Sequence, residues 1–475
     1  MSRNSGLLLG LLVLAGCAGN RWNSPLQQVD VKSGYRFLPP VGPKNSESLF
    51  VILTFSGGGT RAAALSYGAM EKLRDTTIVV NGETRRLLDE VDVISSISGG
   101  SFTAAYYGLY KERLFQDFET RFLKRKVQRA LVLRFLSPWN WPRLLTPSFD
   151  RIDLAAEYYG NHIFDNQKFE ALERQNQAPL IVLNATDMSR ISRFEFTQDE
   201  FDLFCSDLST FPVARAVAAS SAFPIGLTPI TLKAYPRSCG YREPGWLPNA
   251  REERQDGSRR FYNAQLTDAY LDPKLQFVHL LDGGLSDNIG LRGPLQSLFS
   301  SDNPRSAPDD VGDRSILQKI NLKKIDTILV IAVNARTRSR DKLGARKNAP
   351  RLPGMIGAVA TGSMGNYSFE TIELLKESMR QWTTDVQQTE DCRELFQENC
   401  RDGEFPDEPL QRVAYYPVEL TFDSINDQTK RERLQSTSTS FQLDPAQVDE
   451  LVRVGGELLD ENPSFQEFLQ AFSPP

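Results

Sequence analysis

Four serines lie in the stretch Val91–Phe102, where an apolar, β-branched run changes into a cluster of Ser and Gly residues. A strand that ends at a serine and turns directly into a helix is typical of a nucleophile elbow. The elbow bends so tightly that the residues two before and two after the nucleophile must both be small. Only Ser98 meets this condition, because Ser96 and Gly100 flank it. The pattern S-x-S-x-G differs from the usual G-x-S-x-G, so a Ser-rich β–α turn without chemistry stays an alternative.

A second candidate for chemistry is a glycine loop between a strand pattern and a helix pattern. Backbone N–H groups of Gly57, Gly58 and Gly59 at a helix N-terminus could stabilise a developing oxyanion. The same loop also fits the G-x-G-x-x-G/A fingerprint of a dinucleotide site, with Asp75 near the position of the ribose-binding acid. A tight β–α turn without a function is the third interpretation.

A carboxylate ends another strand pattern, Phe277–Asp282, directly before Gly283 and Gly284. Sites in open α/β sheets form at the carboxyl edge of the strands, so Asp282 is predicted to lie there. Alternation along a strand puts His279 on the face opposite Asp282. The only other histidine, His162, belongs to an unrelated helical segment. A Ser–His–Asp triad therefore has no obvious base, which makes Asp282 the candidate base.

The elements that must position these residues form an alternating series of strands and helices. Buried-strand patterns at Leu49–Phe55, Ala178–Asp187 and Thr327–Asn334 are the clearest. The small-residue stretch Phe211–Pro224 predicts a helix that packs closely on a neighbour. The alternation favours one α/β domain with a mostly parallel sheet. The net charge of −5 over 475 residues argues against a nucleic-acid binder with a dominant basic face.

Aromatic, aliphatic and basic residues are interleaved along Phe115–Trp141. This composition suits an amphipathic helix at a membrane interface or a lid over a lipid site. The same stripe is also shown by any helix that docks on a core. We expect a docked helix for most of the stretch, and the turn around Trp139 and Trp141 is the better candidate for membrane contact.

The N-terminus has the layout of a signal peptide, because the apolar run Leu7–Leu14 is too short to span a bilayer. Leu14-Ala-Gly-Cys17 resembles the lipobox of bacterial lipoproteins, in which the cysteine becomes the acylated first residue. We therefore expect a signal peptide over residues 1–16, lipidation at Cys17 and a polar tether over residues 17–48. Ala18 at the next position favours the outer membrane of the cell envelope.

Four further cysteines suggest disulfides, since an even number in an exported chain commonly forms them. Cys392 and Cys400 bracket what we expect to be a short acidic loop and are the most natural pair, which leaves Cys205 with Cys239. Metal binding is the weaker interpretation, because no C-x-x-C spacing occurs and both histidines are distant in sequence. No metal or cofactor is expected.

Taken together, three motifs resemble the signatures of patatin-like phospholipases, in the order in which that family has them. The motifs are Ser56–Arg61, Ser96–Gly100 and Asp282–Gly284, and the resemblance covers roughly residues 48–335. It implies a three-layer α/β fold with a mostly parallel central sheet. The catalytic core would span residues 49–335, and residues 336–475 would form a C-terminal extension that packs on this core.

The resemblance implies acyl transfer by a Ser98–Asp282 dyad on a phospholipid or lysophospholipid. Ser98 would attack the ester carbonyl while Asp282 takes the proton and later activates water. The glycine loop would hold the oxyanion, and Arg61 would steady this loop or meet a phosphate. Because Ser96 replaces the first elbow glycine, a catalytically inactive envelope scaffold of the same fold remains an alternative. A dinucleotide-binding protein explains only the glycine loop.

Overall fold

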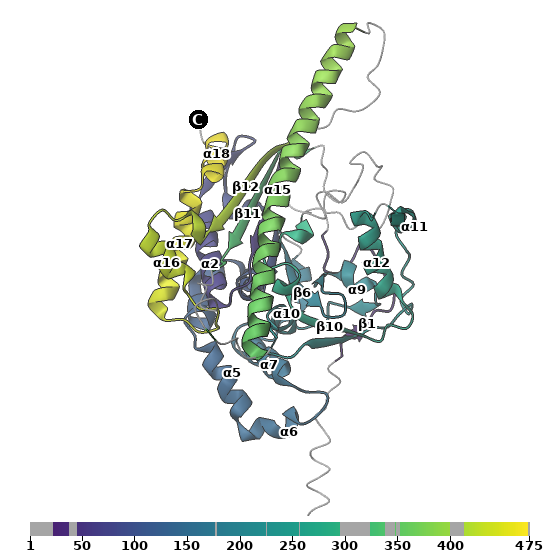
Figure 1. Ribbon diagram of the computed structural model, residues 1–475, viewed down its shortest axis with the longest axis vertical. Coiled ribbons are helices and arrows are strands. Elements are labelled where there is room, and N and C mark those ends of the chain that lie inside the picture. The colour runs from purple at the N-terminus through teal and green to yellow at the C-terminus, as the bar shows by residue number, and fades with distance from the viewer. Residues whose placement is uncertain are drawn as a thin grey trace, which may run out of the picture.

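The central sheet is mixed and mostly parallel, with helices on both faces (Figure 1). The computed structural model describes residues 22–37, 45–175, 178–224, 226–255, 257–294, 324–337, 347, 352–399 and 413–473. The parallel strands are, in spatial order, β12 (Ala414–Thr421), β11 (Thr327–Asn334), β2 (Leu49–Phe55), β5 (Val91–Ile97) and β6 (Leu180–Asp187). The antiparallel strands are β10 (Phe277–Asp282), β9 (Ile230–Lys233) and β7 (Ser192–Glu195). The predicted α/β class is confirmed.

Two strands, β5 and β10, share one edge of β6 and meet there end to end. β7 occupies the opposite edge of β6 over Asn184–Asp187. β5 also pairs with Asn184, and β10 pairs with Ala185–Asp187. Because a strand has only two edges, β5 and β10 must both lie on the edge of β6 that β7 leaves free. Ile97 at the end of β5 pairs with Asn184, and Asp282 at the end of β10 pairs with Ala185. The two strand ends therefore come together at one place.

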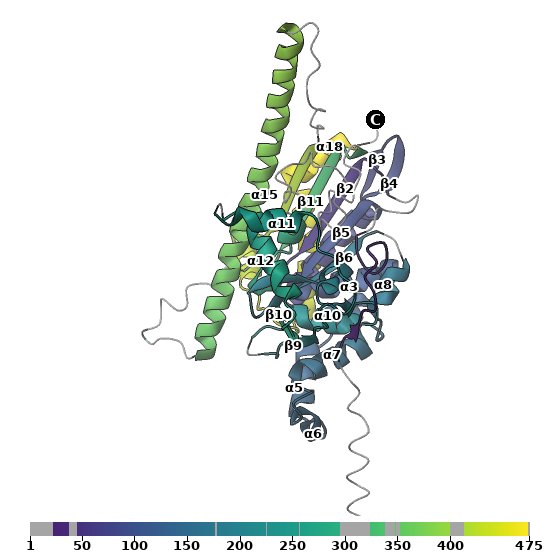
Figure 2. The same cartoon turned by 90° about the vertical axis from the view of Figure 1, so that its right-hand side faces the viewer.

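Helices cover the two faces of the sheet with separate apolar cores, as the three-layer prediction requires. The larger core joins alternate residues of β2 to the helices α2 (Thr60–Asp75), α3 (Gly99–Tyr110), α10 (Val213–Ser220) and α17 (Pro445–Asp460). The other residues of β2 pack with α15 (Leu352–Asn399) through Ile372, Leu375 and Met379. Figure 2 shows α15 along one side of the sheet, with its C-terminal part extending beyond the body.

The C-terminal region is built into the sheet as well as packed on it. β12 forms the edge strand beside β11, and α17 crosses α2 at very short distance. A Cβ atom on Gly68 would lie 1.8 Å from the Val452 carbonyl oxygen, and one on Gly455 would lie 2.4 Å from the Leu65 carbonyl oxygen. Two glycines thus let the helix backbones touch. The predicted extension over residues 336–475 is therefore an integral part of the domain.

Part of the expected tether packs against the domain. Ser24–Pro25 form strand β1, which pairs with β8 (Ser206–Asp207). The buried Asn23 side chain donates to Ser206 Oγ at 2.6 Å and accepts from the Lys233 amide at 2.8 Å. Tyr35 Oη donates to the Ile181 carbonyl oxygen at 3.1 Å. Residues 22–37 are therefore anchored along the domain, whereas residues 1–21 with Cys17 lie outside the described residues.

The interleaved stretch Phe115–Trp141 is broken into short helices rather than one long one. α4 (Leu114–Phe118), α5 (Val127–Leu136) and α6 (Trp141–Leu144) are joined by tight turns. The first part is docked, because Phe118 and Phe122 are buried and Phe122 stacks on Phe102 at 4.1 Å between ring centroids. Apolar side chains of the second part are exposed. Within the described residues, no helix is long and apolar enough to cross a bilayer.

The other elements complete the periphery of the domain. They are the hairpin β3 (Thr77–Val80) and β4 (Glu83–Arg86), and the helices α7 (Arg151–His162), α8 (Phe169–Gln175), α9 (Gln198–Asp202), α11 (Trp246–Glu252), α12 (Arg259–Leu271), α16 (Gln428–Gln435) and α18 (Pro463–Ala471). Asp444 caps α17, and Pro445 lies in its first turn.

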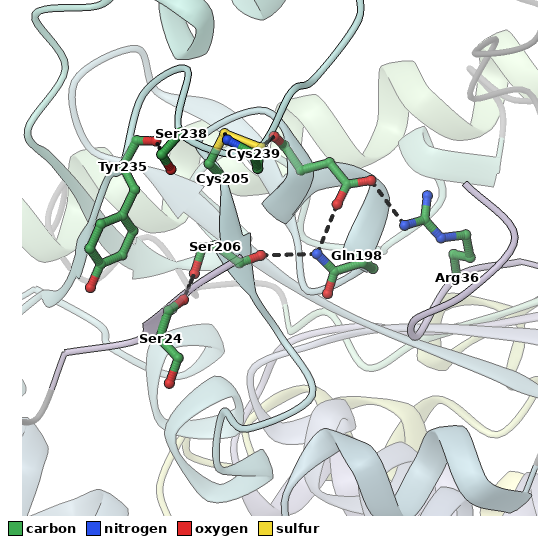
Figure 3. Close-up of a disulfide and its surroundings, with 9 residues drawn as sticks. Ser24, Arg36, Gln198, Cys205, Ser206, Tyr235, Ser238 and Cys239 are labelled. Atoms are coloured by element: carbon green, nitrogen blue, oxygen red, sulfur yellow. Dashed lines mark hydrogen bonds and ion pairs between the residues drawn. A yellow bond between two sulfur atoms is a disulfide. The ribbon is translucent and has the colours of Figure 1, made fainter. Parts of the chain in front are cut away.

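One predicted disulfide is present and the other is not. Cys205 and Cys239 are bonded beside Gln198 and Arg36 (Figure 3), and this bond joins β8 to the segment after β9. Cys392 is a free, exposed thiol within α15, so its predicted bond to Cys400 is wrong. The stretch after Cys392 is helical through Asn399 instead of a loop. Cys400 lies outside the described residues.

Candidate active site

Ser98 occupies the turn between β5 and α3, in a backbone conformation that few non-glycine residues adopt. Its φ is 48° and its ψ is −115°, and it is the N-cap residue of α3. Such strained residues cluster at functional sites and persist only where the surrounding structure holds them. The strand–serine–helix turn expected from the sequence is therefore found, with Ser98 at its apex.

Two glycines follow Ser98 because backbone from the neighbouring strand and loop passes very close. A Cβ atom on Gly99 would lie 2.1 Å from the Gly59 carbonyl oxygen, and one on Gly100 would lie 2.6 Å from Phe55 Cβ. The three atoms nearest to such a Cβ on Gly100 all belong to Phe55. The predicted need for a small residue is thus met, but the close neighbour is β2 rather than Ser96.

A chain of serine hydroxyls holds the turn from inside. The Ser98 amide donates to Ser220 Oγ at 2.8 Å, and Ser220 Oγ is bonded to Ser101 Oγ at 2.9 Å. Ser101 Oγ donates to Ser96 Oγ at 3.2 Å, and Ser96 Oγ donates to the Val182 carbonyl oxygen at 3.3 Å. Ser96 and Ser101 therefore support the elbow. Ser220 on α10 was missed as a site residue, since only its place in a small-residue helix marked it.

Asp282 lies beside Ser98, although β10 runs opposite to the direction that we expected. The strand enters from beyond the carboxyl edge and runs antiparallel to β6, ending where β5 ends. Asp282 Oδ1 accepts from the Gly284 amide at 2.9 Å, and the Ser98 side chain lies near the same carboxylate. Burial raises the pKa of Asp282 to about 7, although the Gly284 amide and the Ser98 side chain lower the pKa. A carboxylate with this pKa could accept a proton near neutral pH.

The Gly283–Gly284 turn is fixed against β6. A Cβ atom on Gly283 would lie 2.5 Å from the Asn184 carbonyl oxygen, and one on Gly284 would lie 2.8 Å from Asn288 Oδ1. Thr186 Oγ1 donates to the Asp282 carbonyl oxygen at 2.8 Å. Both glycines are therefore needed for close approach, and the turn fixes the position of the Asp282 carboxylate.

The glycine loop offers fewer oxyanion donors than expected. The Gly57 amide donates to the Asn288 carbonyl oxygen at 3.0 Å, so this group is already paired and its predicted role is wrong. The amides of Gly58 and Gly59 have no acceptor within the part of the chain that the structure describes. The loop touches the elbow, since a Cβ on Gly57 would lie 3.4 Å from Ser98 Cβ. Gly58 and Gly59 remain as candidate donors.

Arg61 steadies the glycine loop through carbonyl groups. Its Nε donates to the Ala335 carbonyl oxygen at 2.9 Å, and its Nη1 donates to the Thr437 carbonyl oxygen at 2.7 Å. Burial lowers the pKa of Arg61 to about 10. Among the described residues no carboxylate forms an ion pair with Arg61. The predicted loop-steadying role is thus what the contacts support.

The first turn of α2 is occupied by protein, which argues against a dinucleotide. The Thr60 amide donates to the Ser440 carbonyl oxygen at 2.8 Å, and a Cβ on Gly59 would lie 2.4 Å from the same oxygen. A pyrophosphate would need this helix N-terminus. Asp75, the proposed ribose ligand, forms an ion pair with Arg74 at the far end of α2. The dinucleotide interpretation therefore lacks its phosphate site.

Neither histidine is near the Ser98–Asp282 pair. His279 is exposed on β10 and bonds Thr231 Oγ1 through Nδ1 at 2.9 Å, whereas Asp282 is buried on the other face. His162 stacks on Tyr158 at 4.3 Å between ring centroids, and its Nδ1 lies 3.0 Å from the Tyr158 carbonyl oxygen. The strand-parity argument from the sequence is confirmed. In the described ranges, no group of three His, Cys, Asp or Glu side chains could hold a metal ion.

The fold and the elbow define an α/β protein with a serine at the apex of a strand–helix turn and a carboxylate in contact with it. A sequence model of the family described as "Patatin-like phospholipase" matches residues 53–295, which is half of the chain. The chain belongs to this family. No curated protein matches it in sequence.

Solved structures with a similar chain trace include phospholipases. Human GIVD cytosolic phospholipase A2 is 15% identical with a TM-score of 0.43, over 90% of this chain and 62% of that one. The same protein in complex with methyl gamma-linolenyl fluorophosphonate is 14% identical with a TM-score of 0.39, over 90% and 59%. VipD from Legionella pneumophila is 11% identical with a TM-score of 0.32, over 97% and 73%. This chain thus spans about three fifths of the first protein's length.

Proposed function

We propose that this protein hydrolyses carboxylic esters of phospholipids or lysophospholipids with a Ser98–Asp282 dyad. Membership of the patatin-like phospholipase family supports lipid hydrolysis in general. The observation that carries the dyad is the contact between a strained serine and a buried carboxylate with a pKa of about 7. No cofactor is needed for this chemistry.

In the acylation step, Ser98 Oγ attacks the ester carbonyl carbon while its proton moves to the Asp282 carboxylate. The carbonyl oxygen becomes an oxyanion next to the amides of Gly58 and Gly59. When the tetrahedral intermediate collapses, the bond to the alcohol breaks and Asp282 returns its proton to the leaving oxygen. Water then attacks acyl-Ser98 by the same route, and the fatty acid leaves.

The experiment compares variants of the full chain on a short-chain p-nitrophenyl ester and with a fluorophosphonate probe. Ser98→Ala should abolish both hydrolysis and labelling. Asp282→Asn should slow acylation by about 10²–10⁴-fold, because it keeps the size of the side chain and removes the base. His279→Gln is the matched control on the same strand and should keep its activity.

Three results would contradict the proposal. Labelling that survives in Ser98→Ala but vanishes in Ser96→Ala or Ser101→Ala would move the nucleophile. A folded His279→Gln variant that acylates as slowly as Asp282→Asn would replace the dyad by a triad. A folded wild-type chain that neither hydrolyses the ester nor reacts with the probe would leave the scaffold alternative.

We further propose that the protein is an exported lipoprotein held at the bacterial outer membrane through Cys17. The lipobox-like sequence supports this location, as does the Cys205–Cys239 disulfide, since such bonds persist in oxidising compartments. Cys17→Ser should release the chain from the membrane fraction after a high-salt wash, which weakens charge-based contacts but not a lipid anchor. A mature wild-type chain that carries no lipid on Cys17 by mass spectrometry would contradict anchoring there.

A further inference from the structure

The α5–α6 segment carries the most exposed apolar side chains of the described part of the molecule. Leu136 is 66% exposed, Leu145 85% and Trp139 90%. Among the other large apolar residues that the structure describes, only Val359, at 70%, is more exposed than Leu136. Val132, Leu133 and Trp141 in the same segment are also about half exposed or more, at 46%, 58% and 53%. An exposed patch of this kind on a soluble domain marks an interaction site.

The segment is held firmly by its other side. Val127 and Leu131 are buried on one face of α5, whereas Val132, Leu133 and Leu136 are exposed on the other. The Gln128 amide donates to the Phe441 carbonyl oxygen at 3.2 Å, and the guanidinium of Arg134 lies 5.2 Å from the centroid of the Tyr158 ring. α5 therefore has two apolar faces, of which only one is satisfied by the domain.

The chain around the exposed face carries only basic charges, of which Arg121, Lys124 and Arg143 form ion pairs with acids from outside this stretch. Between Glu119 and Asp150 the chain contains seven Lys and Arg residues and no Asp or Glu, although its net charge is −5. Lys126 and Arg129 at the start of α5 are exposed, and within the described residues no acid pairs with them. Apolar residues with two tryptophans among clustered cations match the interfacial region of an anionic bilayer.

The exposed face lies at the end of the molecule that contains the active site. α5 and α6 project from the end where β10 and α10 lie (Figures 1 and 2). α5 is also tied to the glycine loop, because Phe441 accepts from Gln128 while the adjacent Ser440 accepts from the first turn of α2 at Thr60. A surface bound to α5–α6 would thus lie at the end of the domain that contains Ser98 and Asp282.

We propose that α5–α6 inserts its exposed apolar side chains into the surface of a membrane that contains anionic phospholipid. This role rests on the proposed function, since it delivers the enzyme to aggregated lipid. It is separate from the N-terminal anchor, because it uses folded residues of the domain. The basic residues provide attraction to the lipid head groups, and Leu136, Trp139 and Leu145 provide the apolar contact.

Binding is measured by co-sedimentation with vesicles of phosphatidylcholine, with and without phosphatidylglycerol. All proteins are full chains that carry Ser98→Ala and Cys17→Ser, so neither hydrolysis nor the proposed anchor contributes. The test variant replaces Leu136, Trp139 and Leu145 by Gln, and the control makes the same change at Tyr262, Phe369 and Leu395, which are 51%, 57% and 59% exposed on α12 and α15. The test variant should lose roughly tenfold or more in binding to anionic vesicles, whereas the control should not.

A second pair of measurements separates this proposal from the proposed function. With Ser98 and Cys17 restored, the Leu136/Trp139/Leu145 variant should hydrolyse a soluble ester normally but hydrolyse anionic vesicles more slowly. Lys126→Gln with Arg129→Gln should weaken binding only to the anionic vesicles. Vesicle binding can thus be positive even if the chain hydrolyses nothing.

The proposal is overturned if the test variant binds anionic vesicles as tightly as the control. It is also overturned if the background protein is a dimer that the test variant converts to a monomer without any change in vesicle binding. In that case a second copy of the chain covers this face.

Discussion

At the scale of single residues, the chemistry depends on the burial of Asp282. No cation among the described residues pairs with this carboxylate, so burial raises its pKa while the Gly284 amide and the Ser98 side chain lower it. A base must be ionised to accept the proton of Ser98. Acylation should therefore rise with pH through about 7 and level off above it.

The same pKa predicts how stability depends on pH. The pKa of Asp282 is about 7 in the folded chain, above the usual value of 3.8 for an aspartate. Between these values the folded chain binds more protons than the unfolded chain, so its stability falls as pH rises through this window. Asp282→Asn removes this loss and should raise the melting temperature over wild type more at pH 8 than at pH 5. A larger gain at pH 5 would contradict the assignment.

Ser220 positions Ser98 without contacting substrate. Its hydroxyl accepts from the Ser98 amide, which is buried and would lose its acceptor in Ser220→Ala. We expect kcat to fall while KM changes little, together with a loss of about 1–3 kcal/mol of stability. Ser221→Ala is the matched control, since Ser221 Oγ bonds back to the Val217 carbonyl oxygen of its own helix. A purely structural role would lower stability in Ser220→Ala with kcat unchanged.

At the scale of elements, the contact between α2 and α17 depends on Gly455 but not on Gly456, the next residue in the sequence. A Cβ on Gly455 would strike the backbone of α2, whereas the nearest atom to a Cβ on Gly456 is Lys72 Cβ at 3.7 Å. Gly455→Ala should therefore destabilise the fold by about 1–3 kcal/mol. Gly456→Ala should stabilise it by up to about 1 kcal/mol, as is usual inside a helix. Denaturant unfolding of both variants measures the difference, and equal effects would refute the close crossing.

The arrangement of β5, β6 and β10 brings Ser98, the proposed nucleophile, to Asp282, its proposed base. β5 delivers Ser98 and β10 delivers Asp282 to one edge of β6 from opposite directions. The register of each strand with β6 sets the position at which that strand ends. The elbow and the Gly283–Gly284 turn are thus coupled through Asn184, whose carbonyl oxygen lies against Gly283 and whose side chain donates to Ser95 Oγ at 3.0 Å.

At the scale of the whole molecule, segments far apart in the sequence complete the site. Ser440 from the C-terminal region bonds the first turn of α2, and Asn288 holds the Gly57 amide. A core that ended at residue 335 would therefore lack Ser440, which binds the first turn of α2. Removal of residues 413–475 should abolish folding. It takes away β12, the edge strand of the sheet, and α17, the helix that packs on α2.

The Cys205–Cys239 bond should stabilise the whole domain. It closes a loop of 34 residues, for which chain entropy predicts a contribution of up to about 4 kcal/mol. Cys205→Ser with Cys239→Ser should lower the melting temperature, and a reductant should do the same to the wild type. Cys392→Ser should have no effect, because that thiol is free and exposed. A reductant that lowers stability in the double variant as well would contradict this assignment.

The sequence by itself determined the features that depend on neighbouring residues. The size of the residues around Ser98 selected the elbow serine, and the alternation along β10 turned His279 away from Asp282. The apolar runs marked the buried strands. These patterns are local, since side-chain volume and the two-residue period of a strand act within a few positions.

Only the tertiary structure decided the features that depend on which distant groups become neighbours. It reversed the direction of β10, paired the Gly57 amide with Asn288 and placed Ser220 beneath Ser98. It also extended a helix through Cys392, where a loop was expected. In the first three cases the deciding quantity is the pairing of a backbone group with a partner far away in sequence. Such a partner is chosen by sheet register and helix packing, which a single local pattern does not contain.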